Sequence, residues 1–473
     1  FDTIATDFTF ARGSEATYVD AQGLIKSTNE IGPELVTNGD FSDGSTGWTL
    51  GVGHTVSGSK LNINGASFTY QPVQQTVSSR YRLSFSVSNY VSGTIRVYTG
   101  SGTSSVRIDA SSDGNFELDY IANGNTVYVQ PTGGIFIGSI DNVSIKEVIT
   151  ATNTPRLDYS TGAEAFLLEP QSTNLITYSE DFSNASWTAV NTTITSDYGI
   201  SPDGTNNSTR LVFGSGTAYV NRSEAIGVGD QASSIYVKGI SGQILKFGKG
   251  ANVGSGTNFT LNGDWQRLEQ ISTNSGTAYH ISSNIGGANA TEVEVWGAML
   301  ENQSYATSYI PTSGTTVTRN QETCINATPE INSEEGVLYA EIAALTDGGT
   351  FRAISLNDGT TNNNNVIRIY CASADNRITI IIRSNGILVL NYNHTLTSIT
   401  DFNKIAIKYK QNDFSLWVNG VNIHTETTGN TPIGLNELVF NNGLGTELFF
   451  GNTKDVQVYT KALSDAELIK LTT

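Results

Sequence analysis

Cysteine is almost absent from this chain of 473 residues, which contains only Cys324 and Cys371. Two cysteines cannot supply the set of bridges that holds small secreted domains together. One bridge between them stays open as an alternative, but we favour two free, buried thiols. Packed sheets must therefore stabilise the fold, and the chain is long enough for about three domains.

Positive charge is also scarce, because 26 Lys and Arg residues stand against 44 Asp and Glu residues, for a net charge of −18. Nucleic acids and anionic membranes are held by basic patches, so we expect neither as a partner. Charged residues make up only 15% of the chain, and Ser, Thr, Asn and 48 glycines supply its polarity. This composition is typical of extracellular β proteins.

Long apolar runs are missing too. A membrane span needs about 18 apolar residues, and the most apolar strand, Ile378 to Ile382, is flanked by Arg377 and Arg383. We therefore expect no membrane insertion. The first residues show no basic segment followed by an apolar run, and we expect no signal peptide in them.

Alternation of apolar and polar residues recurs along the whole chain, separated by Gly, Asn, Asp and Ser. In the segment 81–87, for example, Leu83, Phe85 and Val87 alternate with polar residues that would face water. This pattern predicts an all-β fold of tandem β-sandwich, or jelly-roll, modules. The capping box Ser464-Asp-Ala-Glu467 predicts one short C-terminal helix.

An internal repeat divides the first two thirds of the chain. The segment 39–48, which contains Asp-Phe-Ser and a Trp, is echoed by 180–187, and each copy ends on an alternating strand. We predict four parts: an N-terminal framework segment (1–30), an inserted jelly roll (31–150), a related jelly roll with a linker (151–320), and a different sandwich (321–473).

Two of these parts resemble known domain families. The hairpin Trp417-Val-Asn-Gly420 and the closing run 455–468 resemble laminin-G-like, concanavalin-type sandwiches. The first module, from Glu34 through Trp48 to its last strand at 141–145, resembles carbohydrate-binding-module jelly rolls. Both resemblances imply the fold, and the second carries little information about the ligand.

Three further stretches, 7–25, 154–175 and 305–312, resemble a family of tailed-bacteriophage virion proteins, namely tail or head fibres and receptor-binding appendages. In that family the first two stretches normally lie close together, whereas here the inserted module separates them. The resemblance implies an extracellular location on the virion, other virion proteins and host cell-surface polysaccharide as partners, and a homo-oligomer, most often a trimer.

Residues able to do chemistry are few. The four histidines, His54, His280, His394 and His424, do not have metal-ligand spacing, and no Gly-x-Ser-x-Gly elbow is present. Glu292 and Glu294 could form the pair of carboxylates that a glycosidase needs. Alternating valines separate them, however, so we expect both to face solvent and the protein not to be an enzyme.

Glycan binding is the function that the residues favour. Aromatic faces stack on sugar rings, and Asn and Asp side chains bind hydroxyl groups. The five tryptophans recur at framework positions and are expected in the core. The candidates for glycan binding are therefore residues on predicted loops or exposed strand faces: Tyr70, Tyr98, Asn357, Asp358, Asn362 and Asn363.

Calcium is the one cofactor considered. Jelly rolls of the resembling family often hold a structural Ca²⁺ with oxygen ligands from the first and last strands. Glu34, Asp40 and Asp141 are the residues at those places. No Asp-x-Asp-x-Asp loop is present.

Three other functions stay open. A secreted or surface bacterial lectin or adhesin would share the same modules, and a purely structural virion decoration protein would share the same resemblance. A polysaccharide hydrolase or lyase would need a catalytic cluster that the sequence does not reveal.

Overall fold

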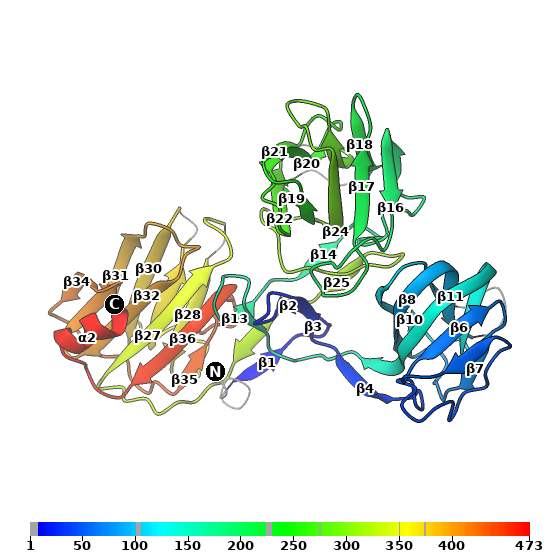
Figure 1. The fold of residues 1–473 in the computed structure, drawn as a ribbon. Helices are drawn as coiled ribbons and strands as arrows, with labels where there is room; N and C mark the ends of the chain where they lie inside the picture. The colour runs from blue at the N-terminus through cyan, green and yellow to red at the C-terminus, as the bar shows by residue number, and fades with distance from the viewer. Residues whose placement is uncertain (1–7, 101–105, 224–228, 274–275, 350, 373–374) are drawn as a thin grey trace.

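The computed structural model describes residues 8–100, 106–223, 229–273, 276–349, 351–372 and 375–473. It confirms the all-β prediction, with 52% of residues in strands and 2% in helix. Three lobes meet at a centre formed by the N-terminal strands and by two later segments of the chain (Figure 1). No helix within the described residues is both long and apolar enough to cross a membrane.

The first lobe (30–149) is built around two long antiparallel strands, β8 (Arg80–Thr99) and β11 (Thr126–Ile149), which pair along most of their length. The pairing of β8 with β11 has register shifts near the middle of both strands. In β8, Asn89 and Gly93 take positive φ angles in this region. The two halves of each strand therefore belong to different layers. The remaining strands are β4 (Glu30–Glu34), β5 (His54–Val56), β6 (Leu61–Gly65), β7 (Thr69–Pro72), β9 (Val106–Ala110) and β10 (Gly114–Ile121).

The core of this lobe follows the alternation in the sequence. Leu83, Phe85 and Val87 are almost fully buried, while Arg82 and Ser84 lie on the other face of the strand. The inward and outward positions of β8 were therefore predicted correctly, because the period of a strand is fixed at two residues.

The second lobe (176–304) is a sandwich of two five-stranded sheets, in the orders β15-β18-β23-β20-β21 and β16-β17-β24-β19-β22. Its strands are β15 (Thr188–Val190), β16 (Thr192–Thr195), β17 (Thr209–Phe213), β18 (Ala218–Ser223), β19 (Gln231–Gly239), β20 (Ile244–Gly250), β21 (Thr257–Thr260), β22 (Gln266–Ser272), β23 (Ala278–Ser283) and β24 (Glu292–Glu301).

The repeated motif has the same structure in both lobes. Phe41 and Trp48 pack with ring centroids 5.3 Å apart, and Phe182 packs on Trp187 at 4.9 Å. Each indole Nε1 donates to a backbone carbonyl just upstream, at 3.1 Å in both cases. Four of the five tryptophans are buried as expected, and Trp265 is half-buried.

The third lobe (327–473, joined by 157–168) packs a seven-stranded sheet on a five-stranded one, in the orders β12-β13-β36-β27-β32-β33-β34 and β31-β30-β29-β28-β35. Its strands are β12 (Leu157–Asp158), β13 (Ala165–Leu168), β27 (Glu335–Ala344), β28 (Arg352–Asn357), β29 (Val366–Cys371), β30 (Arg377–Ser384), β31 (Ile387–Thr395), β32 (Asn403–Lys410), β33 (Phe414–Val418), β34 (Val421–Glu426), β35 (Glu437–Val439) and β36 (Gly451–Tyr459).

Two local predictions hold in this lobe. Asn419 and Gly420 have φ angles of 48° and 82°, as the type I′ turn of the β33–β34 hairpin requires. Helix α2 (Asp465–Thr472) begins where the capping box predicts, and the Glu467 carboxylate accepts hydrogen bonds from the Ser464 amide and hydroxyl. Leu468 and Leu463 pack together beneath the helix.

The lobes are connected through a junction, which comprises residues 8–29, 151–156, 169–175 and 305–326. It contains the short strand pairs β1 (Thr9–Ala11) with β26 (Thr323–Ile325), β2 (Thr17–Val19) with β3 (Ile25–Ser27), and β14 (Ser172–Asn174) with β25 (Val317–Arg319). Strand β13, from the segment that follows the first lobe, pairs with β36 at the far end of the sequence. Strands β12 and β13 therefore lie in the sheet of the third lobe.

Both cysteines are free and buried, which is the alternative that we favoured. Burial raises the pKa of the Cys371 thiol to about 11 and that of Cys324 as well. Since the thiolate is the reactive form, we expect neither thiol to react with DTNB at pH 8 in the native protein. Both should react after unfolding in guanidinium, and rapid labelling of the native protein would contradict the buried placement.

Candidate functional site

A continuous row of tyrosines crosses the outer face of the first lobe. In the strand order β9-β8-β11-β7, Arg107, Tyr98, Tyr128 and Tyr70 are successive cross-strand partners. Tyr98 stacks on Tyr128 with centroids 4.7 Å apart and planes 12° from parallel. Tyr70 lies on the other side of Tyr128, at 5.9 Å. The three rings therefore form one aromatic surface.

A second row lies one strand period away and adds polar groups. Tyr98 donates its hydroxyl hydrogen to Gln130 Oε1 at 2.9 Å. Arg96 and Asp109 form a two-bond ion pair, with both nitrogen–oxygen distances at 2.6 Å. Phe68, which is 43% exposed, packs against Tyr128 at 5.9 Å and closes the row. We call the set Phe68, Tyr70, Tyr98, Tyr128 and Gln130 the tyrosine face.

The strands place these rings on the outer face, where the three tyrosines are half-buried, because their other positions fill the core. Val97, Val127 and Val129, the neighbours of Tyr98 and Tyr128, are fully buried. Burial and the neighbouring Tyr128 raise the pKa of Tyr98, so its hydroxyl stays a neutral donor at physiological pH. The face thus offers apolar ring surface, neutral hydroxyl and amide groups, one charge-balanced ion pair and, at the end of the tyrosine row, the exposed Arg107.

This arrangement suits a saccharide. The C–H surface of a sugar ring packs on an aromatic ring, and its hydroxyls exchange hydrogen bonds with hydroxyl and amide groups. Of the predicted residues, the structure brings Tyr70 and Tyr98 together on this face. The sequence analysis missed Tyr128, the ring between them, although Thr126-Val-Tyr-Val-Gln130 alternates as clearly as the segments that were used.

The candidates in the third lobe lie elsewhere and are engaged within their own loop. Asn357 is 3% exposed, and its Oδ1 accepts a hydrogen bond from the Gly359 amide, so this side chain closes the loop rather than facing solvent. Asp358 binds Thr360 and Asn365. Asn362 accepts from a backbone amide two residues on, and Asn363 occupies a left-handed position with φ at 59°.

The three candidate calcium ligands do not form a cluster. Glu34 accepts hydrogen bonds from the amides of Val36 and Ile145 and from the Ser144 hydroxyl. Asp40 binds Ser42, and Asp141 binds the amide of the residue that follows it. Among the residues that the structure describes, no three His, Cys, Asp or Glu side chains group in a way that could hold a metal ion.

The residues weighed for catalysis are also dispersed. Glu292 pairs with Arg210 and Glu294 with Lys238 on the outward face of their sheet, as the alternation predicts. His54 contacts Thr69, and His424 stacks on Tyr392 in another lobe. Buried His280 contacts Ser282, and burial lowers its pKa to about 4, so it is neutral at physiological pH.

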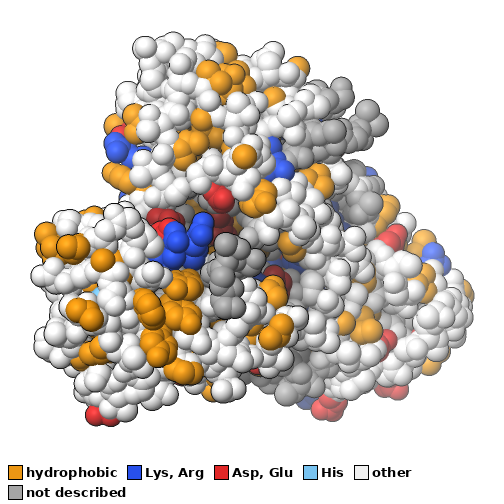
Figure 2. Space-filling model, turned by 90° about the vertical axis from the view of Figure 1, so that its right-hand side faces the viewer, with side chains coloured by type: hydrophobic (Ala, Val, Ile, Leu, Met, Phe, Trp, Pro, Cys, Tyr) orange, Lys and Arg blue, Asp and Glu red, His pale blue; other side chains and the backbone are white. Residues whose placement is uncertain are grey.

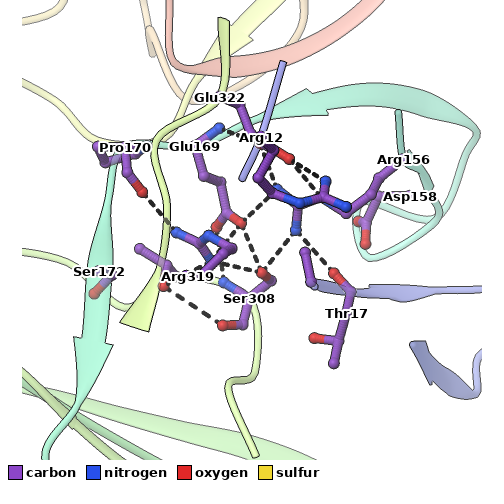
Figure 3. A network of polar contacts seen from close by, with 12 residues as sticks. Arg12, Thr17, Arg156, Asp158, Glu169, Pro170, Ser172, Ser308, Arg319 and Glu322 are labelled. Atoms are coloured by element: carbon purple, nitrogen blue, oxygen red, sulfur yellow. Dashed lines mark hydrogen bonds and ion pairs between the residues drawn. The ribbon is translucent and has the colours of Figure 1, made fainter. Parts of the chain in front are cut away.

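A buried ion-pair network holds the junction (Figure 3). The Glu322 carboxylate accepts hydrogen bonds from Arg12 at 2.7 Å and from Arg156 at 2.6 and 3.0 Å. Glu169 pairs with Arg156 at 2.8 Å and with Arg319 at 2.7 Å. These five side chains are at most 2% exposed. The two arginines lower the pKa of Glu169 to about 2, against the opposing effect of its burial.

The three stretches 7–25, 154–175 and 305–312 meet in this network. The first stretch contributes Arg12, the second contributes Arg156 and Glu169, and the third contributes Ser308. The Ser308 side chain binds Glu169 and Arg319. Segments that are far apart in the sequence therefore meet in one structural unit. Sequence analysis did not find this network, because its members are separated by up to 310 positions.

Glu180, in the second lobe, makes the stability of the protein depend on pH. Burial and the nearby Asp203 raise its pKa to about 7, although it accepts a hydrogen bond from Tyr309 at 2.7 Å. Between about pH 4.5 and 7 the folded state keeps a proton that the unfolded state loses, so stability falls as pH rises. We expect the melting temperature of the wild-type protein to fall, relative to that of Glu180→Gln, as the pH rises through this range. A difference that stays constant from pH 5 to 8 would contradict it.

Comparison with known proteins gives structural similarity only. No family model and no curated protein matches the chain. The carbohydrate-binding module CBM40 of a Ruminococcus gnavus sialidase is similar over 30% of this chain and 84% of its own, at 21% identity and a TM-score of 0.26.

Two tandem structures are similar over longer stretches. The CBM22 pair of Paenibacillus barcinonensis Xyn10C covers 58% of this chain and 98% of its own, at 12% identity and a TM-score of 0.21. Mouse laminin α1 domains LG4–5 cover 85% and 89%, at 9% identity and a TM-score of 0.21. Similarities at this level identify no ligand.

Proposed function

We propose that this chain is a non-enzymatic glycan-recognition protein and that the tyrosine face of its first lobe binds the saccharide. The observation that carries the proposal is the row of Tyr70, Tyr128 and Tyr98 on an outward sheet face, with Tyr98 stacked on Tyr128 and Tyr70 tilted against it. The three rings are half-buried and Phe68 beside them is 43% exposed, so the row is open to solvent in part. Exposed apolar patches mark ligand-binding sites. The neutral hydroxyl and amide groups beside them suit sugar hydroxyls better than a charged ligand.

The surface of the protein agrees with the proposal. In the view of Figure 2, much of the surface is white, which marks the backbone and side chains that are neither hydrophobic nor charged. Such a surface resists nonspecific adhesion. A protein that must select one polysaccharide among many surfaces benefits from that property.

The setting that we propose is a bacteriophage virion, in which the chain acts as a fibre or receptor-binding appendage and contacts host-surface polysaccharide and other virion proteins. Its support is the resemblance of the three stretches that build the junction. Mass spectrometry of purified phage particles tests this setting. A homo-oligomer, such as a trimer, belongs to the same proposal and is measured by light scattering.

The experiment for the function is incubation of the purified chain with a panel of bacterial polysaccharides, with retention and released oligosaccharides measured together. We expect retention on a subset of the panel without product. Released oligosaccharides would overturn the non-enzymatic part of the proposal. Absence of retention across the panel would overturn glycan recognition and favour a structural virion component.

A further inference from the structure

The outer face of the five-stranded sheet in the third lobe carries arginines. In β29 and β30 the isoleucines at 367, 369, 378, 380 and 382 point into the core. The alternate positions, on the outer face, hold Arg368 and Tyr370 in β29 and Arg377 and Arg383 in β30. Three positive charges thus lie on one sheet face of a chain whose net charge is −18.

These arginines lack the acidic partners that several outward arginines have in the other lobes. In the other lobes, Arg82 pairs with Asp119, Arg96 with Asp109 and Arg210 with Glu292 across neighbouring strands. Within the described residues, no carboxylate lies within 4.0 Å of Arg368, Arg377 or Arg383. The sheet therefore presents positive charge that no direct ion pair neutralises, although the Glu447 carboxylate acts on Arg368 from beyond Tyr370.

Arg368 is the most unusual of the three. It is 4% exposed, and its Nε has no hydrogen-bond partner. Its close polar neighbour is the hydroxyl of Tyr370, which in turn donates to Glu447 Oε2 at 2.9 Å. The Glu447 carboxylate acts on Arg368 from beyond Tyr370 and does not contact the guanidinium, so the buried charge is only partly compensated. An anion that reached the guanidinium directly would complete the compensation.

The groups around Arg368 are those that bind sugar hydroxyls. Arg368 lies opposite Ile381 of β30, and Ile381 lies opposite Asn391, which is exposed on β31. One row away, Asn393 is exposed and accepts a hydrogen bond from Thr379 at 2.7 Å. On the other side, the exposed Glu447 carboxylate is held by Tyr370 and Asn442.

We propose that this face binds a saccharide unit carrying an anionic group, a carboxylate or a sulfate, with that group on Arg368 and the sugar hydroxyls on Asn391, Asn393 and Glu447. A guanidinium matches such groups by two parallel hydrogen bonds. Arg383, half-buried in the next row, adds a second positive charge. The site lies in a different lobe from the tyrosine face and does not depend on it.

The test is isothermal titration of the full chain with oligogalacturonate, a sulfated galacto-oligosaccharide and a neutral galacto-oligosaccharide of the same length, with inorganic sulfate as a separate arm. We expect at least one anionic oligosaccharide to bind at least tenfold more tightly than the neutral one, with an affinity that falls as NaCl is added. Equal affinity for charged and neutral ligands, or no binding of either anionic ligand, would overturn the proposal. Binding of inorganic sulfate as tight as that of the sulfated oligosaccharide would overturn the sugar contacts.

Variants assign the binding to Arg368. Arg368→Gln should weaken binding of the anionic ligand at least tenfold, and Arg368→Lys and Arg383→Gln should weaken it less. Lys461→Gln, which removes one exposed positive charge from the same lobe, is the matched control and should have no effect. Equal effects of Arg368→Gln and Lys461→Gln would contradict the site.

Two further measurements test this site independently of the tyrosine face. Because Arg368→Gln removes a buried charge that no carboxylate contacts directly, we expect its melting temperature without ligand to equal or exceed that of the wild type. A Tyr128→Ala variant should retain binding of the anionic ligand in full. Loss of that binding in Tyr128→Ala would place the ligand on the tyrosine face and overturn the second site.

Discussion

Replacing Glu322 by alanine is expected to destabilise the junction by about 3–5 kcal/mol, because it leaves buried charges without their partner. Arg12 would lose its carboxylate entirely, and Arg156 would keep only Glu169. The amide of Glu169, which donates to Glu322 Oε2 at 2.7 Å, would also lose its acceptor. Few single substitutions in this chain remove as many buried contacts.

The effect should be confined to the junction at first. Each lobe has a hydrophobic cluster of its own, so we expect the lobes to stay folded while the connections between them loosen. Limited proteolysis should cut Glu322→Ala near residues 8–29 and 305–326 before the lobes, and small-angle scattering should give a larger radius of gyration. Glu330→Ala, an exposed glutamate nearby, is the control. Identical cleavage patterns for the two variants would contradict the role of the network.

Replacing Tyr128 by alanine is expected to weaken binding of the retained polysaccharide by about 10- to 100-fold, or roughly 1.4–2.7 kcal/mol. Tyr128 is the central ring and contacts Phe68, Tyr70 and Tyr98. Its removal takes away ring surface and also frees the neighbouring rings from their stacked positions. Affinity electrophoresis or calorimetry with the retained ligand measures the effect.

Two controls separate stacking from other causes. Tyr128→Phe keeps the ring and should bind almost as well as the wild type. Tyr198→Ala removes an aromatic side chain that is 48% exposed in the second lobe and should leave affinity unchanged. Equal losses in Tyr128→Ala and Tyr198→Ala would show that the tyrosine face has no special part in binding.

The regular parts of the fold could be predicted because they follow from local rules. The alternation in β8 places Leu83, Phe85 and Val87 inward whatever the strand pairs with, since successive side chains point to opposite faces. The hairpin at Asn419-Gly420 and the capping box at Ser464 depend on residues within one turn. In each case the information lies within a few positions of the sequence.

The candidate site could be predicted only in part, because it depends on strand register. Tyr70 and Tyr98 could be chosen as exposed aromatic residues, but their meeting at Tyr128 requires β11 to pair with β7 on one side and β8 on the other. The ion-pair network of the junction and the pairing of β13 with β36 depend on contacts between distant segments in the same way. Asn357 shows the converse, since its loop folds so that the side chain is buried.

The most direct measurement of the central claim is hydroxyl-radical footprinting of the wild-type chain, free and saturated with the polysaccharide that retains it. The account predicts that the ligand protects Tyr70, Tyr98 and Tyr128 from oxidation, while Tyr198 in the second lobe reacts at the same rate in both states. Unchanged oxidation of the three tyrosines on a fully bound protein would contradict the claim that this face recognises the glycan.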